Sequence, residues 1–297
     1  MSSINQKSTK KSKKISKGSA SLDSVSLRPF LRWAGGKQKL VRFLLPFVPS
    51  RENFNRYYEP FFGAGALFFA MQPNNAVISD TNSELMNCYQ QISKNPTSVN
   101  RLLQQYAKRD CSEFFYRVRA RSAETMSAEE RAARFIYLNK AAFNGIYRVN
   151  TNGYFNVPYG PSFNGPAIPS KEALILAGRC LLKAKIWTGD FEEVLANASS
   201  GDFVYLDPPY PPLSNTAYFT HYSPERFSWN DQKRVAGVFA ELSKRGCLVM
   251  LSNSDQERVT SLYRRFYISR LNVVRWLGSN GDRFRVREIL VTNYNPT

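Results

Sequence analysis

The chain has 297 residues, and its 41 lysines and arginines outnumber 23 aspartates and glutamates to give a formal net charge of +18. A surplus of that size indicates a polyanionic partner, and nucleic acid is the commonest polyanion for a basic protein. No apolar run approaches the roughly 20 residues needed to cross a bilayer, so we expect no membrane partner.

Metal and disulfide chemistry are both disfavoured by residue usage. The four cysteines are widely separated and His221 is the single histidine, so we expect no metal site. The same spread of cysteines argues against a disulfide scaffold and fits a reducing cytoplasm. We expect His221 to be a surface or packing residue rather than a proton carrier.

Residues 1–27 are of low complexity, with lysines scattered among serines and threonines. Such a segment buries too little apolar surface to fold, so we expect a disordered basic tail. Loose contact with phosphate groups and a dispensable extension fit this tail equally well.

An alternating strand and helix pattern follows. Residues 57–62 predict a buried strand, Gly63-Ala64-Gly65 a tight turn, and residues 66–71 a helix. A second strand at residues 77–80 ends in an acid, Asp80. This order is typical of the front half of a nucleotide-binding α/β sheet.

The middle of the chain changes character. Residues 96–142 are helical and basic in pattern, and Ser127-Ala128-Glu129-Glu130 has the spacing of a capping box. Alternating runs at residues 147–150 and 154–157 flank Asn152-Gly153, which is a strong hairpin signal.

Strand patterns return after a helix predicted at residues 170–183. They lie at residues 186–188, 203–206, 247–252, 271–276 and 288–293. We therefore expect an α/β fold in which a helical and hairpin insertion interrupts one sheet.

The most informative motif is Asp207-Pro208-Pro209-Tyr210, which directly follows the strand at residues 203–206. A carboxylate at the carboxyl end of a buried strand lies at the ligand-binding edge of an open α/β sheet. Because prolines lack backbone N–H groups, we expect the two proline carbonyls to face outward as acceptors. A planar base with an exocyclic amino group needs a carboxylate, a carbonyl and an aromatic face. The motif favours such a site over an ordinary acidic strand end.

Several motifs occur in a fixed order. They are Phe30-Leu31-Arg32-Trp33-Ala34-Gly35-Gly36-Lys37, Glu59-Pro60-Phe61-Phe62-Gly63-Ala64-Gly65, Asp80-Thr81-Asn82, Asn144-Gly145-Ile146-Tyr147-Arg148 and Asp207-Pro208-Pro209-Tyr210. From about residue 30 to 294 the chain resembles the Dam family of DNA adenine methyltransferases. The resemblance implies a Rossmann-like methyltransferase sheet, with residues 28–84 and 186–297 as the catalytic domain. It implies that residues 85–185 are an inserted helical and β-hairpin DNA target-recognition region.

The resemblance also implies S-adenosyl-L-methionine as the cofactor. The positions that match the family's cofactor contacts are Trp33, Lys37, Phe62, Gly63, Gly65, Asp80, Asp190, Phe191 and Asp207. By this match Lys37 suits the methionine carboxylate, and the Trp33 ring packs near the sulfonium. Asp80 matches the acid that binds the ribose hydroxyls. Asp190 and Phe191 resemble the site of the adenine ring, although Phe191 equally suits ordinary core packing.

The catalytic residues implied are Asp207, Pro208 and Tyr210. Hydrogen bonds from the adenine amino group to the Asp207 carboxylate and the Pro208 carbonyl would localise the nitrogen lone pair toward the methyl group. Tyr210 would stack on the base, and alignment would supply much of the rate. Since N6 is inaccessible inside a duplex, the adenine must be flipped out.

Four positions match residues that meet double-stranded DNA: Arg32, Phe143, Asn144 and Arg148. Phe143 suits an aromatic wedge in the base stack, and Arg148 suits either guanine edges or plain phosphate contact.

The chain departs from its relatives after Asn156-Val157-Pro158-Tyr159-Gly160. Relatives that methylate GATC commonly place Arg-Tyr-Lys there, whereas this chain has Pro161-Ser162-Phe163-Asn164-Gly165. GATC is therefore a first expectation, beside a changed or relaxed site. We expect a monomeric bacterial or phage-encoded enzyme, with a cognate restriction endonuclease as a possible partner. The alternatives are a cytosine-N4 or RNA adenine methyltransferase and, from another class, a non-catalytic DNA-binding regulator.

Overall fold

The computed structural model describes residues 27–150, 153–211, 227–276 and 283–296. The basic tail predicted for residues 1–27 lies almost wholly outside these ranges, and so does His221. Among the described residues, no helix is long and apolar enough to cross a membrane. Within the same ranges, no group of three or more histidine, cysteine or acidic residues is placed to hold a metal ion.

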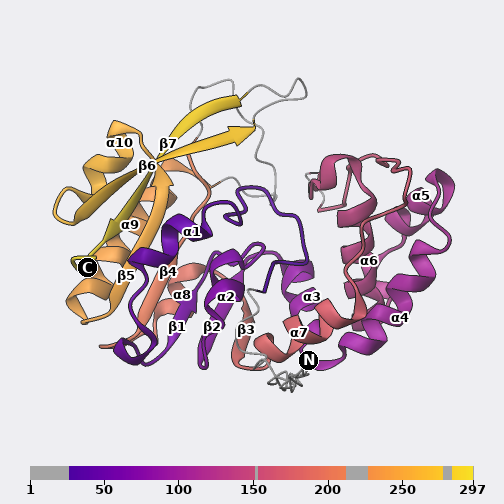
Figure 1. Ribbon diagram of the computed structural model, residues 1–297, viewed down its shortest axis with the longest axis horizontal. Helices are drawn as coiled ribbons and strands as arrows, with labels where there is room; N and C mark the ends of the chain where they lie inside the picture. The colour runs from indigo at the N-terminus through magenta and orange to yellow at the C-terminus, as the bar shows by residue number, and fades with distance from the viewer. Residues whose placement is uncertain (1–26, 151–152, 212–226, 277–282, 297) are drawn as a thin grey trace, which may run out of the picture.

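One seven-stranded sheet organises the described chain, in the order β3-β2-β1-β4-β5-β7-β6 (Figure 1). The strands are β1 (Tyr57–Glu59), β2 (Ala76–Asp80), β3 (Ala184–Thr188), β4 (Phe203–Leu206), β5 (Leu248–Ser254), β6 (Tyr267–Trp276) and β7 (Arg283–Thr292). The first five in sheet order are parallel, whereas β7 runs antiparallel to both of its neighbours. The predicted α/β fold is confirmed. Strands β2 and β3 are added on one side of β1, whereas β4 and β5 are added on the other, so the topological switch point lies between β1 and β4. Open α/β sheets bind ligands at such a point.

Helices cover both faces of the sheet. They are α1 (Val41–Leu44), α2 (Ala66–Met71), α3 (Ser83–Lys94), α4 (Pro96–Ala107), α5 (Ser112–Ala120), α6 (Ala128–Ala141), α7 (Lys171–Leu181), α8 (Phe191–Leu195), α9 (Trp229–Lys244) and α10 (Glu257–Thr260). Alternate residues of a strand enter different cores, as in β1, where Tyr57 packs with α2 and α3 and Tyr58 packs with α8 and α9.

Several predicted strands have different bounds. The first is shorter than residues 57–62, because Pro60 cannot donate to the ladder and the chain turns at once into the glycine loop. The last two are longer than residues 271–276 and 288–293, because β6 and β7 pair along their full lengths. Polar residues such as Ser269 interrupt the apolar pattern, so the pattern alone does not reveal the full length of these strands.

The helical insertion shares its core with the sheet. Helices α3 and α7 lie between the sheet and helices α4 to α6 (Figure 1), and one apolar cluster continues through all of them. The predicted capping box is confirmed at the start of α6, since Ser127 Oγ accepts from the Glu130 N–H and Glu130 Oε2 accepts from the Ser127 N–H. The proposed boundary at residues 85–185 thus crosses a continuous core.

The predicted hairpin exists but is short. Val149 and Phe155 form a single bridge, flanked by a hydrogen bond from the Asn156 N–H to the Arg148 carbonyl at 3.0 Å. The second arm then leaves, because Pro158 has no N–H and the next residue, Tyr159, pairs with Ala142 instead.

A buried amide ties the N-terminal segment to the insertion. Asn139, on α6, is 0% exposed; its Oδ1 accepts from the Arg32 N–H at 2.9 Å, and its Nδ2 donates to the Arg32 carbonyl at 2.7 Å. This two-way bond gives residues 30–37 a fixed position although they have little secondary structure of their own.

We predict that Asn139→Ala lowers the free energy of unfolding by about 2 kcal/mol, because two backbone groups of Arg32 lose their partner. Urea unfolding followed by circular dichroism measures this change. Asn100→Ala is the matched control, since the buried Asn100 Oδ1 has no partner among the described residues. Equal losses in the two variants would contradict the role given to Asn139.

Candidate active site

The acidic ends of the parallel strands meet at one edge of the sheet. Glu59 ends β1, Asp80 ends β2, and Asp207 directly follows β4. Since β1 lies between β2 and β4, the sheet order alone brings these carboxylates to a common edge.

Asp207 is oriented through one of its two oxygens. Its Oδ1 lies 2.7 Å from Lys37 Nζ and accepts from Ser252 Oγ at 2.7 Å. Ser252 is held in turn by the Tyr205 hydroxyl at 2.9 Å. Among the described residues Oδ2 receives no hydrogen bond, so it remains available to a ligand. Burial raises the pKa of the Asp207 carboxyl, and Lys37 and Ser252 oppose that rise by stabilising the charged form.

Two glutamine side chains hold the loop after Asp207. The Pro209 carbonyl accepts from the buried Gln232 Nε2 at 2.7 Å, and the Pro211 carbonyl accepts from Gln256 Nε2 at 3.0 Å. The expectation that both proline carbonyls face outward is therefore wrong for Pro209. For Pro208 the expectation remains a prediction, since its carbonyl meets no donor in the part of the chain that the structure describes.

Tyr210 is fixed at two points. Its hydroxyl donates to Glu288 Oε2 at 2.8 Å, and Lys37 Nζ lies 4.6 Å from its ring centroid. Lys37 therefore connects the carboxylate of Asp207 with the aromatic ring of Tyr210.

Glu59 is a second buried carboxyl beside this group. It is 3% exposed and accepts from the Tyr57 hydroxyl at 2.7 Å. Burial raises the pKa of Glu59 to about 8, and the nearby negative charge of Asp207 adds to the rise. Glu59 is thus largely protonated at neutral pH, which limits the negative charge next to Asp207.

The glycine turn predicted after β1 is confirmed. The Gly65 N–H donates to the Phe62 carbonyl at 2.7 Å, and both Gly63 and Gly65 have positive φ. The Gly63 N–H donates to Asp80 Oδ2 at 3.0 Å, so the turn and the second acid are joined. The Phe62 ring lies in the core against Gly65 and supports the turn from within.

Trp33 closes over this turn. A Cβ added at Gly63 would lie 2.7 Å from Trp33 Cδ1, which explains why the position takes no side chain. On its other side the indole stacks on Tyr147, with ring centroids 5.0 Å apart. Trp33 therefore links the turn after β1 to the segment that precedes the hairpin.

Asp190 and Phe191 lie next to Asp80 at the carboxyl edge, since the Gly189 N–H donates to the Asp80 carbonyl at 3.3 Å. Asp190 caps α8 and pairs with Arg234 of α9 at 2.8 Å. The Arg234 guanidinium also lies 4.7 Å from the centroid of the buried Phe191 ring. A ligand that packs against Phe191 must therefore share this place with Arg234.

The positions predicted to meet DNA form one surface beside Trp33. Arg32 is exposed and packs over Gly145, where a Cβ would lie 2.3 Å from Arg32 Cδ. Phe143 is 52% exposed, and Asn144 holds the left-handed conformation with φ of 55°. Arg148 is exposed and its Nε donates to Asn156 Oδ1 at 2.8 Å.

Residues 161–165, the segment expected to depart from relatives that methylate GATC, directly follow Gly160, which packs against the Phe143 backbone. The Gly165 N–H donates to the Ser162 carbonyl at 3.0 Å, and within that turn Phe163 is fully exposed. An aromatic ring held in water without contacts favours a role in binding over one in folding.

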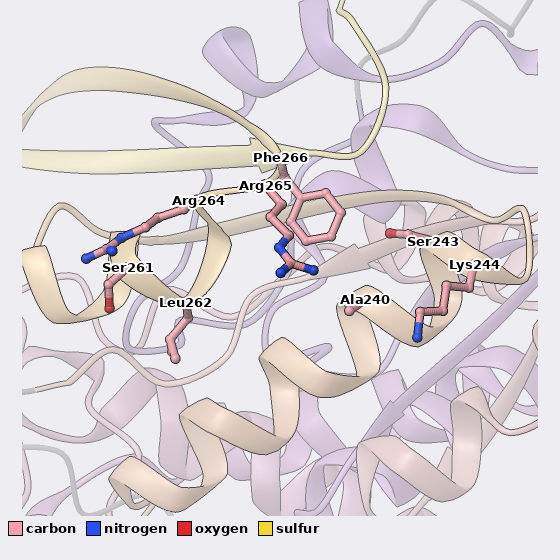
Figure 2. A pocket seen from close by; sticks show the side chains of 8 residues that line it. All are labelled: Ala240, Ser243, Lys244, Ser261, Leu262, Arg264, Arg265 and Phe266. Atoms are coloured by element: carbon pink, nitrogen blue, oxygen red, sulfur yellow. The ribbon is translucent and has the colours of Figure 1, made fainter.

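A surface cavity lies elsewhere. It has a volume of about 610 Å³ and lies between α9 and residues 261–266, with Lys244, Arg264 and Arg265 among its lining (Figure 2). Because α9 ends beside the start of β5, this cavity is at the opposite edge of the sheet from Asp207. It takes no part in the candidate site.

Sequence reasoning missed the residues that hold the predicted ones in place. They are Ser252, Gln232, Gln256, Asn139 and Glu288. A polar side chain inside an otherwise apolar strand, as at Ser252 and Glu288, was the available signal. That signal does not identify the residue to which the side chain bonds.

Comparisons with known proteins agree on one family. Residues 33–276 match the family described as D12 class N6 adenine-specific DNA methyltransferase. The type II methyltransferase M1.LlaDCHI of Lactococcus lactis subsp. cremoris is 42% identical over 279 residues, covering 92% of this chain and 97% of that protein. The type II methyltransferase M.MjaIII of Methanocaldococcus jannaschii is 37% identical, covering 91% and 100% respectively. The DNA adenine methylase of Escherichia coli K12 is 31% identical, covering 91% and 96%.

The raised pKa of Glu59 predicts a pH dependence of stability. Native Glu59 retains a proton up to about pH 8, whereas an ordinary glutamate loses it near 4.5. The contribution of Glu59 to the free energy of unfolding is therefore fully present below pH 4.5 and is lost as pH rises toward 8. The glutamine in Glu59→Gln stays neutral at every pH. We therefore predict that the melting temperature falls less between pH 5 and pH 8 in this variant than in the wild type.

Thermal unfolding at the two pH values measures this difference. The exposed Glu257→Gln is the control and should follow the wild type. Parallel behaviour of wild type and Glu59→Gln would show that Glu59 is charged in the native protein.

Proposed function

This chain belongs to the D12 class of N6 adenine-specific DNA methyltransferases, and we propose that it uses S-adenosyl-L-methionine to methylate an adenine flipped out of double-stranded DNA. The observation that carries the proposal is the arrangement at Asp207. One carboxylate oxygen is held by Lys37 and Ser252, while Oδ2 and the Pro208 carbonyl meet no hydrogen-bond donor among the described residues.

An adenine amino group has two protons and a lone pair delocalised into the ring. If one proton is donated to Asp207 Oδ2 and the other to the Pro208 carbonyl, the lone pair is localised on the face away from both acceptors. The two acceptors are fixed before the base arrives, because Ser252 holds Asp207 and Gln232 holds the adjoining Pro209 carbonyl. Such preorganisation lowers the cost of reaching the transition state.

The residues of the carboxyl edge fit the cofactor. Bound S-adenosyl-L-methionine would supply a methyl group on a positively charged sulfur. The Asp80 carboxylate is aligned by the Gly63 and Asn82 N–H groups, each at 3.0 Å, and suits ribose hydroxyls as donors. The Trp33 ring packs directly on the bare backbone at Gly63 and offers an aromatic wall beside this turn. Lys37, Asp190 and Phe191 complete the set of residues proposed to contact the cofactor, and Arg234 competes with the cofactor for Asp190.

We propose that Tyr210 stacks on the flipped base and that Arg32, Phe143, Asn144 and Arg148 meet the duplex. Support comes from their placement, since these four positions lie on one exposed surface next to the carboxyl edge. Phe143 suits the space left in the base stack, and Arg148 is presented by Asn156 in one orientation.

The target sequence that we propose first is GATC, by resemblance to the Dam family. The segment at residues 161–165, with its exposed Phe163, is where a different or relaxed specificity would arise. Two similar proteins are named as type II methyltransferases, which suggests a cognate restriction endonuclease as a partner. We further propose that the chain acts as a monomer, with residues 28–84 and 186–297 as the catalytic part and residues 85–185 as the recognition part.

Incubation with unmethylated genomic DNA and S-adenosyl-L-methionine, followed by methylation-sensitive sequencing, tests the reaction and the target together. We expect N6-methyladenine within one short motif, with GATC as the first candidate. N4-methylcytosine, or no modified base, would overturn the proposed reaction. Another motif would retain the reaction and assign the departure at residues 161–165 to specificity.

We predict that Asp207→Asn lowers the rate of methyl transfer at least 10²–10³-fold, because the amide cannot accept equally from Lys37, Ser252 and the base. Radiolabelled methyl incorporation measures the rate, and circular dichroism reports the fold. Asp255→Asn is the control, since it removes a carboxylate that pairs with exposed Arg270. Near-normal turnover by Asp207→Asn would remove Asp207 from the mechanism.

A further inference from the structure

Glu288 is a buried acid at the start of an apolar stretch of β7. It is 1% exposed, and the three residues that follow it, Ile289, Leu290 and Val291, are buried and apolar. Its strand, β7, lies inside the sheet between β5 and β6. Burying a carboxylate is costly unless good partners compensate, so the partners of Glu288 indicate what it does.

The carboxylate has a partner at the candidate active site. The Tyr210 hydroxyl donates to Glu288 Oε2 at 2.8 Å, across 78 positions of sequence. A hydrogen bond to a charged acceptor is about twice as strong as one between neutral groups. The bond fixes the outer end of the tyrosine ring to a rigid strand.

A positive charge lies over the same ring. Lys37 Nζ lies 4.6 Å from the Tyr210 centroid and 2.7 Å from Asp207 Oδ1. Tyr210 lies on a loop and has no regular secondary structure to hold it. Between Glu288 and Lys37 the ring is held in one orientation relative to the Asp207 carboxylate.

We infer that Glu288 is a positioning residue for methyl transfer, which sets the plane of the Tyr210 ring against which the target base stacks. The inference rests on the proposed stacking role of Tyr210. Its consequence is specific: Glu288 acts through the tyrosine hydroxyl, so it should affect the rate of transfer and the capture of the flipped base. It should leave cofactor affinity unchanged.

A double-mutant cycle tests this coupling. Glu288→Gln keeps the size of the side chain and replaces a charged acceptor by a neutral one, which weakens the bond, while Tyr210→Phe removes the hydrogen bond altogether. Single-turnover methylation is measured for both variants, their combination and the wild type, on a duplex carrying the motif found by sequencing. We expect each single variant to be about tenfold slower and the combination to be no slower than either.

Two further measurements separate positioning from a structural role. Binding of S-adenosyl-L-homocysteine by calorimetry should change less than twofold in Glu288→Gln. The fluorescence of 2-aminopurine at the target position should show less of the flipped state. Thr292→Val is the matched control on the same strand, since it removes a buried hydroxyl that contacts only the Tyr294 carbonyl among the described residues. It should keep the wild-type rate.

The outcomes divide clearly. A wild-type rate for Glu288→Gln, or a hundredfold loss in the combination, would overturn the inference, because independent effects multiply. A loss of S-adenosyl-L-homocysteine affinity as large as the loss of rate would do the same. Tyr210→Ala distinguishes the underlying proposal: its normal turnover would remove the stacking role itself. A slow Tyr210→Ala beside a normal Glu288→Gln would remove only the positioning role.

Discussion

The buried ion pair between Lys37 and Asp207 is the interaction on which the rest of the site depends. It joins a segment near the start of the chain to the end of β4, and it leaves one oxygen of Asp207 for a ligand. Two further acidic side chains, Glu59 and Glu288, lie near the Asp207 carboxylate, and Lys37 is 4% exposed. Their charges are tolerable together because Glu59 is largely protonated and Glu288 receives the Tyr210 hydroxyl.

The same N-terminal segment also couples the two parts of the fold. Asn139 of α6 holds the backbone of Arg32, and the next residue, Trp33, stacks on Tyr147 while covering Gly63. The surface proposed to meet DNA and the turn proposed to hold the cofactor are thus in direct contact. A displacement of the DNA surface would therefore shift the glycine turn, because packed rings rather than a flexible linker connect them.

At the far end of the carboxyl edge, Arg234 makes the site less open than its motifs suggest. The guanidinium pairs with Asp190, Glu192 and Asp231, and it lies over the Phe191 ring. With 40% of its side chain exposed, each pair is worth little by itself, so rearrangement of Arg234 is inexpensive. The proposed adenine site therefore combines a rigid wall, Phe191, with an adaptable one.

Sequence by itself determined the family, the α/β order of elements and the residues proposed to carry the chemistry, because each depends on local pattern. Asp207 ends an apolar strand, Asp80 ends another, and the glycine turn follows a third. Only the tertiary structure decided how these residues are held. Ser252, Gln232 and Glu288 are 45, 23 and 78 positions away from Asp207, Pro209 and Tyr210. Strand order and register bring them together, and a hydrophobic pattern contains neither, since pairing partners are chosen by packing across the whole sheet.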